Sequence, residues 1–255
     1  MMKRSNEKDH GSKIRGSGGV GLNISGYIAS ALRNHPMTSA ALSTLWDLES
    51  VQRDLQTAHA KNSEPHLLKT LKQNTFLFCE LIERQFSVQP IFHEVTIGSN
   101  RCDFAWLNDS SDGPEWVLVE VERPGIQLFT QKGDPSAPLN HAIEQVKSWR
   151  QYFNQFPAEK ARIFGAVKSF RYVLVAGSTE TWNSEHASKW RADRNSEDEI
   201  EIRTNGIFSR AIKSYRMNPD AFWSYSANPN TRDPSTLEAY WTGYSYFNDW
   251  RKWLH

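Results

Sequence analysis

Two neighbouring stretches near the middle of the chain are rich in apolar residues and are separated by turn formers, and this pattern predicts a β-hairpin. The stretches are 101–107 and 115–122, and the second is an apolar run rich in β-branched residues. Between them, 108–114 reads Asn-Asp-Ser-Ser-Asp-Gly-Pro, a cluster of turn formers. The predicted hairpin register places Leu107 opposite Trp116.

Three acidic residues fall on this hairpin at positions that bring them together. In the register above, Asp103 lies opposite Glu120, with the two Cβ atoms about 5 Å apart. Glu122 follows Glu120 by two positions, so both side chains point to the same face of the strand. Like charges packed this closely need a proton or a cation, and carboxylate oxygens suit a hard ion such as Mg²⁺.

The same acids also have a simpler interpretation. Acidic residues are common at strand ends, where Glu122 would lie in solvent beside Arg123 and Asp103 would satisfy a turn. Glu120 favours a functional site, because valines flank it on both sides within an otherwise buried strand. A carboxylate in that position needs a partner.

Further elements follow from the same kind of pattern. A helix over 139–153 separates the hairpin from a very apolar strand at 172–176, and this order predicts a parallel pair joined by a right-handed crossover. Together with the antiparallel hairpin, it predicts an α/β fold with a mixed central sheet flanked by helices. The remaining predicted elements are one broken helix over 63–86, strands at 91–97 and 199–203, and helices over 184–194 and 207–215.

Two polar side chains of the predicted helix over 139–153 lie close to its buried face. Gln145 follows Ala142 by three positions and precedes Trp149 by four, so it borders the apolar stripe. His141 lies one turn earlier on the same side. We therefore expect Gln145 or His141 to lean over the acids of the hairpin.

The chain divides into four segments by composition and pattern. Its first part is rich in Lys, Arg, Ser, Asn and Gly and cannot offset the entropy of ordering. Gly16, Gly18 and Gly21 have the spacing of a dinucleotide-binding loop, but no strand precedes them, so a flexible linker is the better interpretation. The predicted segments are a disordered arm at 1–22, a helical extension at 23–62, an α/β domain at 63–217 and an aromatic-rich extension at 218–255.

Composition limits the cellular setting and the kinds of partner. The formal net charge is +1, so binding to a polyanion requires a local basic patch. Cys79 and Cys102 are too few for a disulfide framework and are predicted to be buried thiols. No apolar run reaches about 18 residues and no secretory signal is present, so we expect a cytoplasmic protein that does not cross a membrane.

Paired acids serve two classes of hydrolase. Glycoside hydrolysis uses two carboxyl groups about 5 to 9.5 Å apart across a sugar ring, usually in a groove lined by aromatic residues. Metal-assisted phosphodiester hydrolysis uses acids on adjoining strands to hold a divalent ion. The hairpin arrangement favours the second class.

The hairpin and the helix after it resemble a known family. A strand with Asp103, a turn, Val-Glu120-Val-Glu122 and a helix with Gln145 together look like the catalytic core of the PD-(D/E)xK, restriction-endonuclease-like superfamily. A longer string resembles the Shedu anti-phage nuclease family, and the similarity covers roughly 64–215. Its parts are Asp103-Phe-Ala-Trp, Leu-Val-Glu-Val-Glu122-Arg-Pro124, Leu128-Phe-Thr, His141-Ala-Ile-Glu-Gln-Val and Trp149.

The resemblance implies roles for individual residues. Asp103 and Glu120 match the metal-binding acids, and the main-chain carbonyl of Val121 would complete the ligand shell. Gln145 matches the glutamine of the following helix.

Three further acids and their neighbours follow from the same resemblance. The acid that some members carry on the preceding helix corresponds to Glu64 or Glu80. Glu122 stands where the superfamily usually has lysine, so it would act as a base or as an extra metal ligand. The missing positive charge would then come from Arg123, Lys132 or Lys147.

The function implied by the resemblance is cleavage of DNA, including phage DNA, with Mg²⁺ or Mn²⁺ in anti-phage defence. The alternative is a degenerate site, marked by Glu122, that recognises nucleic acid or a partner protein without cleaving it. The aromatic segment 218–255 packs onto its own domain, forms a base-stacking platform, or joins copies of the chain. We expect a homo-oligomer.

Overall fold

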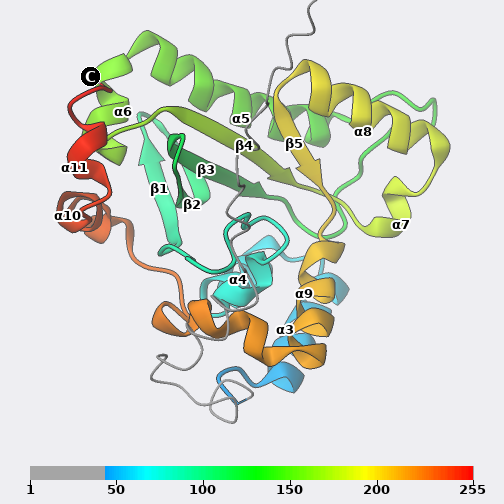
Figure 1. Ribbon diagram of the computed structural model, residues 1–255. Coiled ribbons are helices and arrows are strands. Elements are labelled where there is room, and N and C mark those ends of the chain that lie inside the picture. The colour runs from blue at the N-terminus through cyan, green and yellow to red at the C-terminus, as the bar shows by residue number, and fades with distance from the viewer. Residues whose placement is uncertain (1–43, 255) are drawn as a thin grey trace, which may run out of the picture. The chain divides into compact units, whose positions relative to one another are not determined.

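A mixed five-stranded sheet lies at the centre of residues 44–254, the part of the chain that this computed structural model describes (Figure 1). The strands lie in the sheet in the order of the sequence. The first three pair antiparallel, and the last three pair parallel. Their bounds are β1 Phe92–Ile97, β2 Asn100–Ser110, β3 Gly113–Val121, β4 Ser169–Val175 and β5 Ile200–Arg203. The predicted mixed α/β architecture is confirmed, and β5 is an edge strand as expected.

The hairpin of β2 and β3 has the predicted register. Leu107 pairs with Trp116, and the ladder continues to Phe104 opposite Val119. The turn is shorter than the predicted cluster of turn formers, because β2 runs on to Ser110 and β3 begins at Gly113. Asn108 and its neighbours are therefore strand residues, held by side-chain hydrogen bonds such as that from Asn108 Nδ2 to Glu115 Oε2 at 2.9 Å.

Helices and short turns of 3-10 helix cover both faces of the sheet. The parallel pair β3–β4 is joined through α5 and α6, and β4–β5 through α7 and α8, as the crossover rule requires. α6 and α7 were not predicted. The bounds are α3 Leu48–Ala60, α4 Glu64–Lys72, η1 Thr75–Phe78, α5 Ala137–Gln155, α6 Pro157–Phe164, α7 Thr179–Trp182, α8 Glu185–Glu197, α9 Gly206–Met217, η2 Pro219–Ala227, η3 Pro234–Thr236, α10 Leu237–Gly243 and α11 Phe247–Trp250.

Alternation along β3 divides the core into two apolar clusters. Val117, Val119 and Val121 face a cluster that also contains residues of α3, α4, η1, α9 and η2. Trp116 and Leu118 face the other cluster, with residues of α5, α6, α8 and the C-terminal segment. Successive strand residues point to opposite faces, so Glu120, two positions after Leu118, is on the α5 face.

The segment 63–86 was predicted to be one broken helix, and the structure differs from this prediction. α4 ends at Lys72, and only one turn of 3-10 helix follows, at Thr75–Phe78. The side chain of Asn74 donates to the carbonyl of Thr70 at 2.8 Å, and the N–H of Thr75 donates to the carbonyl of Pro229 at 3.0 Å. The helix stops because a distant part of the chain takes up its backbone groups.

The aromatic C-terminal segment contains η2, η3, α10 and α11. It packs onto its own domain, which is one of the three interpretations above. Phe247 stacks against Trp116 of β3 with ring centroids 6.4 Å apart, and the indole N–H of Trp241 donates to the carbonyl of Ile163 at 3.0 Å.

Three other predictions concern the N-terminal segments, the two cysteines and membrane-spanning helices. The predicted disordered arm and the first part of the helical extension lie outside the described residues, and α3 is the part of that extension that the structure describes. Cys79 and Cys102 are buried free thiols, as predicted. Within 44–254, no helix has the length and apolar character needed to span a membrane.

Candidate active site

The candidate active site lies where the hairpin ladder ends. Asp103 on β2 and Glu120 on β3 are the residues one step beyond the last paired position, and they are 7% and 8% exposed. The Oδ2 atom of Asp103 accepts a hydrogen bond from the main-chain N–H of Val121 at 2.8 Å. The two carboxyl groups are therefore held on buried strand residues, as the hairpin register predicted.

Glu120 has one side-chain partner, and it comes from α5. Ser136 is the N-cap residue of this helix, and its hydroxyl accepts a hydrogen bond from the N–H of Leu139 at 3.2 Å. Two turns further on, Nε2 of Gln145 donates to Oε1 of Glu120. The other carboxylate oxygen, Oε2, is buried and has no hydrogen-bond partner among residues 44–254. An unpartnered buried carboxylate oxygen is costly, so this atom is suited to a cation or a proton.

Four acids form one electrostatic patch around Glu120. Burial raises the pKa of Glu120, and the negative charges of Asp103, Glu122 and Glu64 raise it further. Burial also raises the pKa of Asp103, although the hydrogen bond from Val121 opposes the rise. The pKa values of Glu64 and Glu122 are raised by burial as well. Without a cation the patch therefore retains protons that the same residues would lose in water.

A comparison with known families covers the segment that carries this patch. A family model described as Shedu protein SduA, C-terminal, matches residues 61–205, which is more than half of the 255 residues. The chain belongs to the Shedu family. None of the curated proteins is significantly similar to it in sequence. Membership of the Shedu family suggests a role in anti-phage defence, and the matched segment contains Glu64, Asp103, Glu120, Glu122 and Gln145.

Arg101 contributes positive charge to three acids of the patch in this Shedu-family protein. Its guanidinium opposes the burial-driven rise in the pKa of Asp103, Glu120 and Glu64. Glu94 Oε1 lies 3.3 Å from Arg101 Nη1 and holds it in place. Sequence reasoning missed Arg101, although its position two residues before Asp103 puts it on the same face of β2.

Two predicted residues, Arg123 and His141, also contribute positive charge, and Arg123 lowers the pKa of Glu64 more than Arg101 does. The pKa of Glu122 is raised by burial and by Glu64, and His141 and Arg123 oppose that rise. His141, on the first part of α5, is exposed, so it lies at the edge of the patch. Gln145 and His141 therefore approach the acids from one helix, as predicted.

Other predicted residues lie elsewhere. Glu80 forms two hydrogen bonds with Arg210, at 2.7 and 2.8 Å, which assigns it to a different ion pair and favours Glu64 as the additional acid. Nζ of Lys147 lies 3.0 Å from Oδ1 of Asp198, the residue that follows α8. Lys132 is exposed in the loop before α5.

The donor set of the patch fits a hard divalent cation. Among residues 44–254, no three His, Cys, Asp or Glu side chains are arranged as a ready ion cage. The carboxylates of Asp103 and Glu120 instead use one oxygen each for protein partners. Oε2 of Glu120, which has no hydrogen-bond partner within 44–254 and lies in a cluster of carboxylates whose pKa values burial raises, is the atom to which a Mg²⁺ or Mn²⁺ ion would bind.

Proposed function

We propose that this Shedu-family protein is a restriction-endonuclease-like nuclease of the PD-(D/E)xK type that hydrolyses phosphodiester bonds of DNA with Mg²⁺ or Mn²⁺ in anti-phage defence. The observation that carries the proposal is the buried, unpartnered Oε2 of Glu120 beside Asp103 at the end of an antiparallel hairpin. The mixed sheet, with a parallel strand after the hairpin and α5 across its face, supports it.

The residues divide the chemical tasks between them. Asp103, Glu120 and the main-chain carbonyl of Val121 would hold the ion. The ion would polarise the phosphate and make a bound water more acidic. Gln145 orients Glu120 through its hydrogen bond.

Glu122 and Arg101 are assigned the tasks that lysine performs in the superfamily. Glu122 is half-buried and burial raises its pKa, so its carboxylate is a stronger base toward the attacking water than an exposed glutamate would be. Arg101 supplies the fixed positive charge that stabilises negative charge developing on the phosphate. A glutamate and an arginine would together replace one lysine.

The direct test is nicking of supercoiled plasmid with added Mg²⁺ or Mn²⁺. We expect Asp103→Asn and Glu120→Gln to reduce the rate at least about 100-fold, because each removes a charged metal ligand. Asp112→Asn is the matched control, since Asp112 is an exposed acid in the turn of the same hairpin. Equal nicking by the wild type and both site variants would overturn the proposal.

A second candidate function is recognition of nucleic acid or a partner protein without cleavage. Glu122 favours this function, because the superfamily usually has a positively charged lysine at this position and a glutamate cannot supply that charge. Tight DNA binding, with neither metal-dependent nicking nor a metal-induced rise in melting temperature, would select this function over the first.

A further inference from the structure

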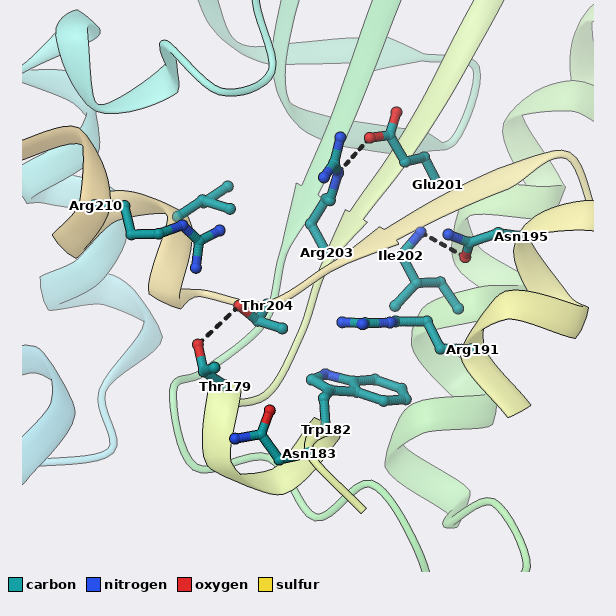
Figure 2. Close-up of a pocket in the computed structure, with 11 residues that line it drawn as sticks. Thr179, Trp182, Asn183, Arg191, Asn195, Glu201, Ile202, Arg203, Thr204 and Arg210 are labelled. Carbon is teal, nitrogen blue, oxygen red and sulfur yellow. Dashed lines mark hydrogen bonds and ion pairs between the residues drawn. The ribbon is translucent and has the colours of Figure 1, made fainter. Parts of the chain in front are cut away.

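A second polar site lies at the end of β5, apart from the carboxylate patch. It is a cleft of about 390 Å³ between β5, α7, α8 and the start of α9. Three arginines line it, Arg191, Arg203 and Arg210, against one acidic residue, Glu201. In Figure 2, Arg191 and Arg210 reach into the cleft from opposite sides. The excess of guanidinium groups makes it a site for an anion.

Arg191 differs from the other two arginines of the cleft in its charged neighbours. Arg203 pairs with Glu201, and Arg210 pairs with Glu80 outside the cleft. Among residues 44–254, no carboxylate forms an ion pair with Arg191, whose guanidinium instead lies over the Trp182 ring at 5.3 Å.

The surroundings of Arg191 disfavour its charge while leaving its donors available. Burial and the positive charge of Arg203 lower the pKa of Arg191. The Trp182 ring fixes the plane of the guanidinium and occupies its face, so the N–H groups at its edge are directed into the cleft. An anion there would restore the balance of charge, and a planar fork of donors suits an oxyanion.

The start of α9 also presents positive potential to the cleft. The helix runs over twelve residues from Gly206, has no acidic residue in its first turn and has no side-chain cap. The side chain of Asn205, at the cap position, instead donates to the carbonyl of Pro124 at 3.2 Å. The N–H groups of Ile207 and Phe208 already donate to the carbonyls of Thr204 and Asn205, at 3.3 and 3.2 Å, so this helix end favours a negative group mainly through the helix dipole.

A glycine allows the close packing at this corner. A Cβ atom at position 206 would lie 2.2 Å from Oγ1 of Thr179 and 3.3 Å from Nη1 of Arg210. The hydroxyl groups of Thr179 and Thr204 lie 3.2 Å apart beside it, at the mouth of the cleft. These hydroxyls add neutral donors to the charged ones.

We propose that this cleft binds a phosphate ester, either the phosphate of a free nucleotide or one phosphate of a nucleic-acid strand. Guanidinium groups, hydroxyls and helix N–H groups are the donors that recognise phosphate oxygens. The volume exceeds that of a lone phosphate and lies within the range of small-molecule sites. β5 lies two strand spacings, about 10 Å, from β3, so the cleft is a separate site at the same edge of the parallel strands.

The test compares Arg191→Gln with a matched control, Arg194→Gln. Arg194 is also on α8 and lies over Trp190 at 5.6 Å, but it pairs with Asp198 and does not line the cleft. Binding is measured in EDTA, by calorimetry for deoxyadenosine monophosphate and by fluorescence anisotropy for a DNA duplex at several salt concentrations.

We expect Arg191→Gln to weaken binding about 10-fold or more and Arg194→Gln to change it little. For the duplex, Arg191→Gln should also reduce the salt slope by about 1, the signature of one lost phosphate contact. An effect on the mononucleotide identifies a nucleotide site, and an effect confined to the duplex identifies a strand phosphate. Unchanged binding of both ligands to a folded Arg191→Gln protein would overturn the inference.

Two additions keep this result separate from the proposed nuclease. Arg191→Lys retains the charge without the planar fork, so it should bind with intermediate affinity, and it substitutes for Arg191→Gln if that protein does not fold. Asp112→Asn, an exposed turn residue outside both sites, should bind both ligands as the wild type does. Arg191-dependent binding by a protein that cuts no DNA would support the cleft and reject the nuclease.

Discussion

Two carboxylates on the hairpin are equally buried but differ in what surrounds them. Asp109 on β2 and Glu120 on β3 are each 8% exposed. Asp109 accepts hydrogen bonds from the Tyr244 hydroxyl at 2.6 Å and from Gln89 at 3.0 Å, and Arg84 lies 3.3 Å away. Within 44–254, only one oxygen of Glu120 has a hydrogen-bond partner, and its charged neighbours are mostly other acids.

The difference separates a structural acid from a functional one. Asp109 connects β2 to the C-terminal segment through Tyr244, so its charge is compensated within the fold. Glu120 has no such compensation, and the folded chain bears the cost of keeping it protonated. Burial of a carboxylate is therefore a weak sign of function, whereas burial with an unpartnered oxygen is a strong one.

The largest expected effect on stability comes from Asp109. Asp109→Ala should lower the free energy of unfolding by about 3 kcal/mol, because Tyr244 and Gln89 lose a charged, buried acceptor. Glu120→Gln should leave the free energy of unfolding unchanged or raise it at pH 8. Urea denaturation followed by tryptophan fluorescence measures both. If Glu120→Gln were the more destabilising change, the two acids would not differ as described.

The pH dependence of stability tests the same contrast. The folded-state pKa values of Glu120, Asp103, Glu122 and Glu64 are raised, so above their unfolded values near pH 4 the folded chain holds more protons than the unfolded chain. Stability in EDTA should thus fall as pH rises from about 5 to 8, by about 1.4 kcal/mol per pH unit for each extra proton. Mg²⁺ should reduce this slope.

The Glu120→Gln variant tests whether Glu120 contributes to this pH dependence of stability. Glu120→Gln cannot ionise at that position, so its stability in EDTA should depend less steeply on pH than that of the wild type. Asp109→Asn should keep the wild-type slope. Denaturant titrations at pH 5.5, 7 and 8.5, at roughly constant ionic strength, give these slopes. A wild-type curve that is flat over this range would contradict the raised pKa values.

The smallest effect distinguishes two acids before the hairpin. Glu64 belongs to the patch, whereas Glu80 is paired with Arg210. Glu64→Gln should reduce the rise in melting temperature caused by Mg²⁺, because it removes negative charge near the ion. Glu80→Gln should leave that rise unchanged. The reverse result would identify Glu80, and not Glu64, as the additional acid of the patch.

Much of the hairpin and its acids was predictable because the relevant signals are local. Strand alternation and a short cluster of turn formers determine a register, and the register pairs Leu107 with Trp116 and brings Asp103 to Glu120. Helical periodicity alone put Gln145 at the border of the buried face of α5, where it meets Glu120. These relations depend on spacing along one or two adjacent segments.

Other features needed contacts between segments far apart in the chain. The end of α4 depends on Pro229, the partner of Asp109 is Tyr244, and the choice between Glu64 and Glu80 depends on Arg210. No local pattern encodes such pairings, because they arise when separate elements pack against one another. The arginine cleft is of the same kind, since α8, β5 and α9 each contribute one guanidinium.

The sequence by itself determined the mixed sheet, the hairpin register and the meeting of Asp103, Glu120 and Gln145, because periods of 2 and 3.6 residues dictate which side chains share a face. Only the tertiary structure decided that, in the described part of the chain, Oε2 of Glu120 has no hydrogen-bond partner while Asp109 has several. Both acids look alike in a strand pattern, and the difference lies in which distant donors reach them once the chain is packed.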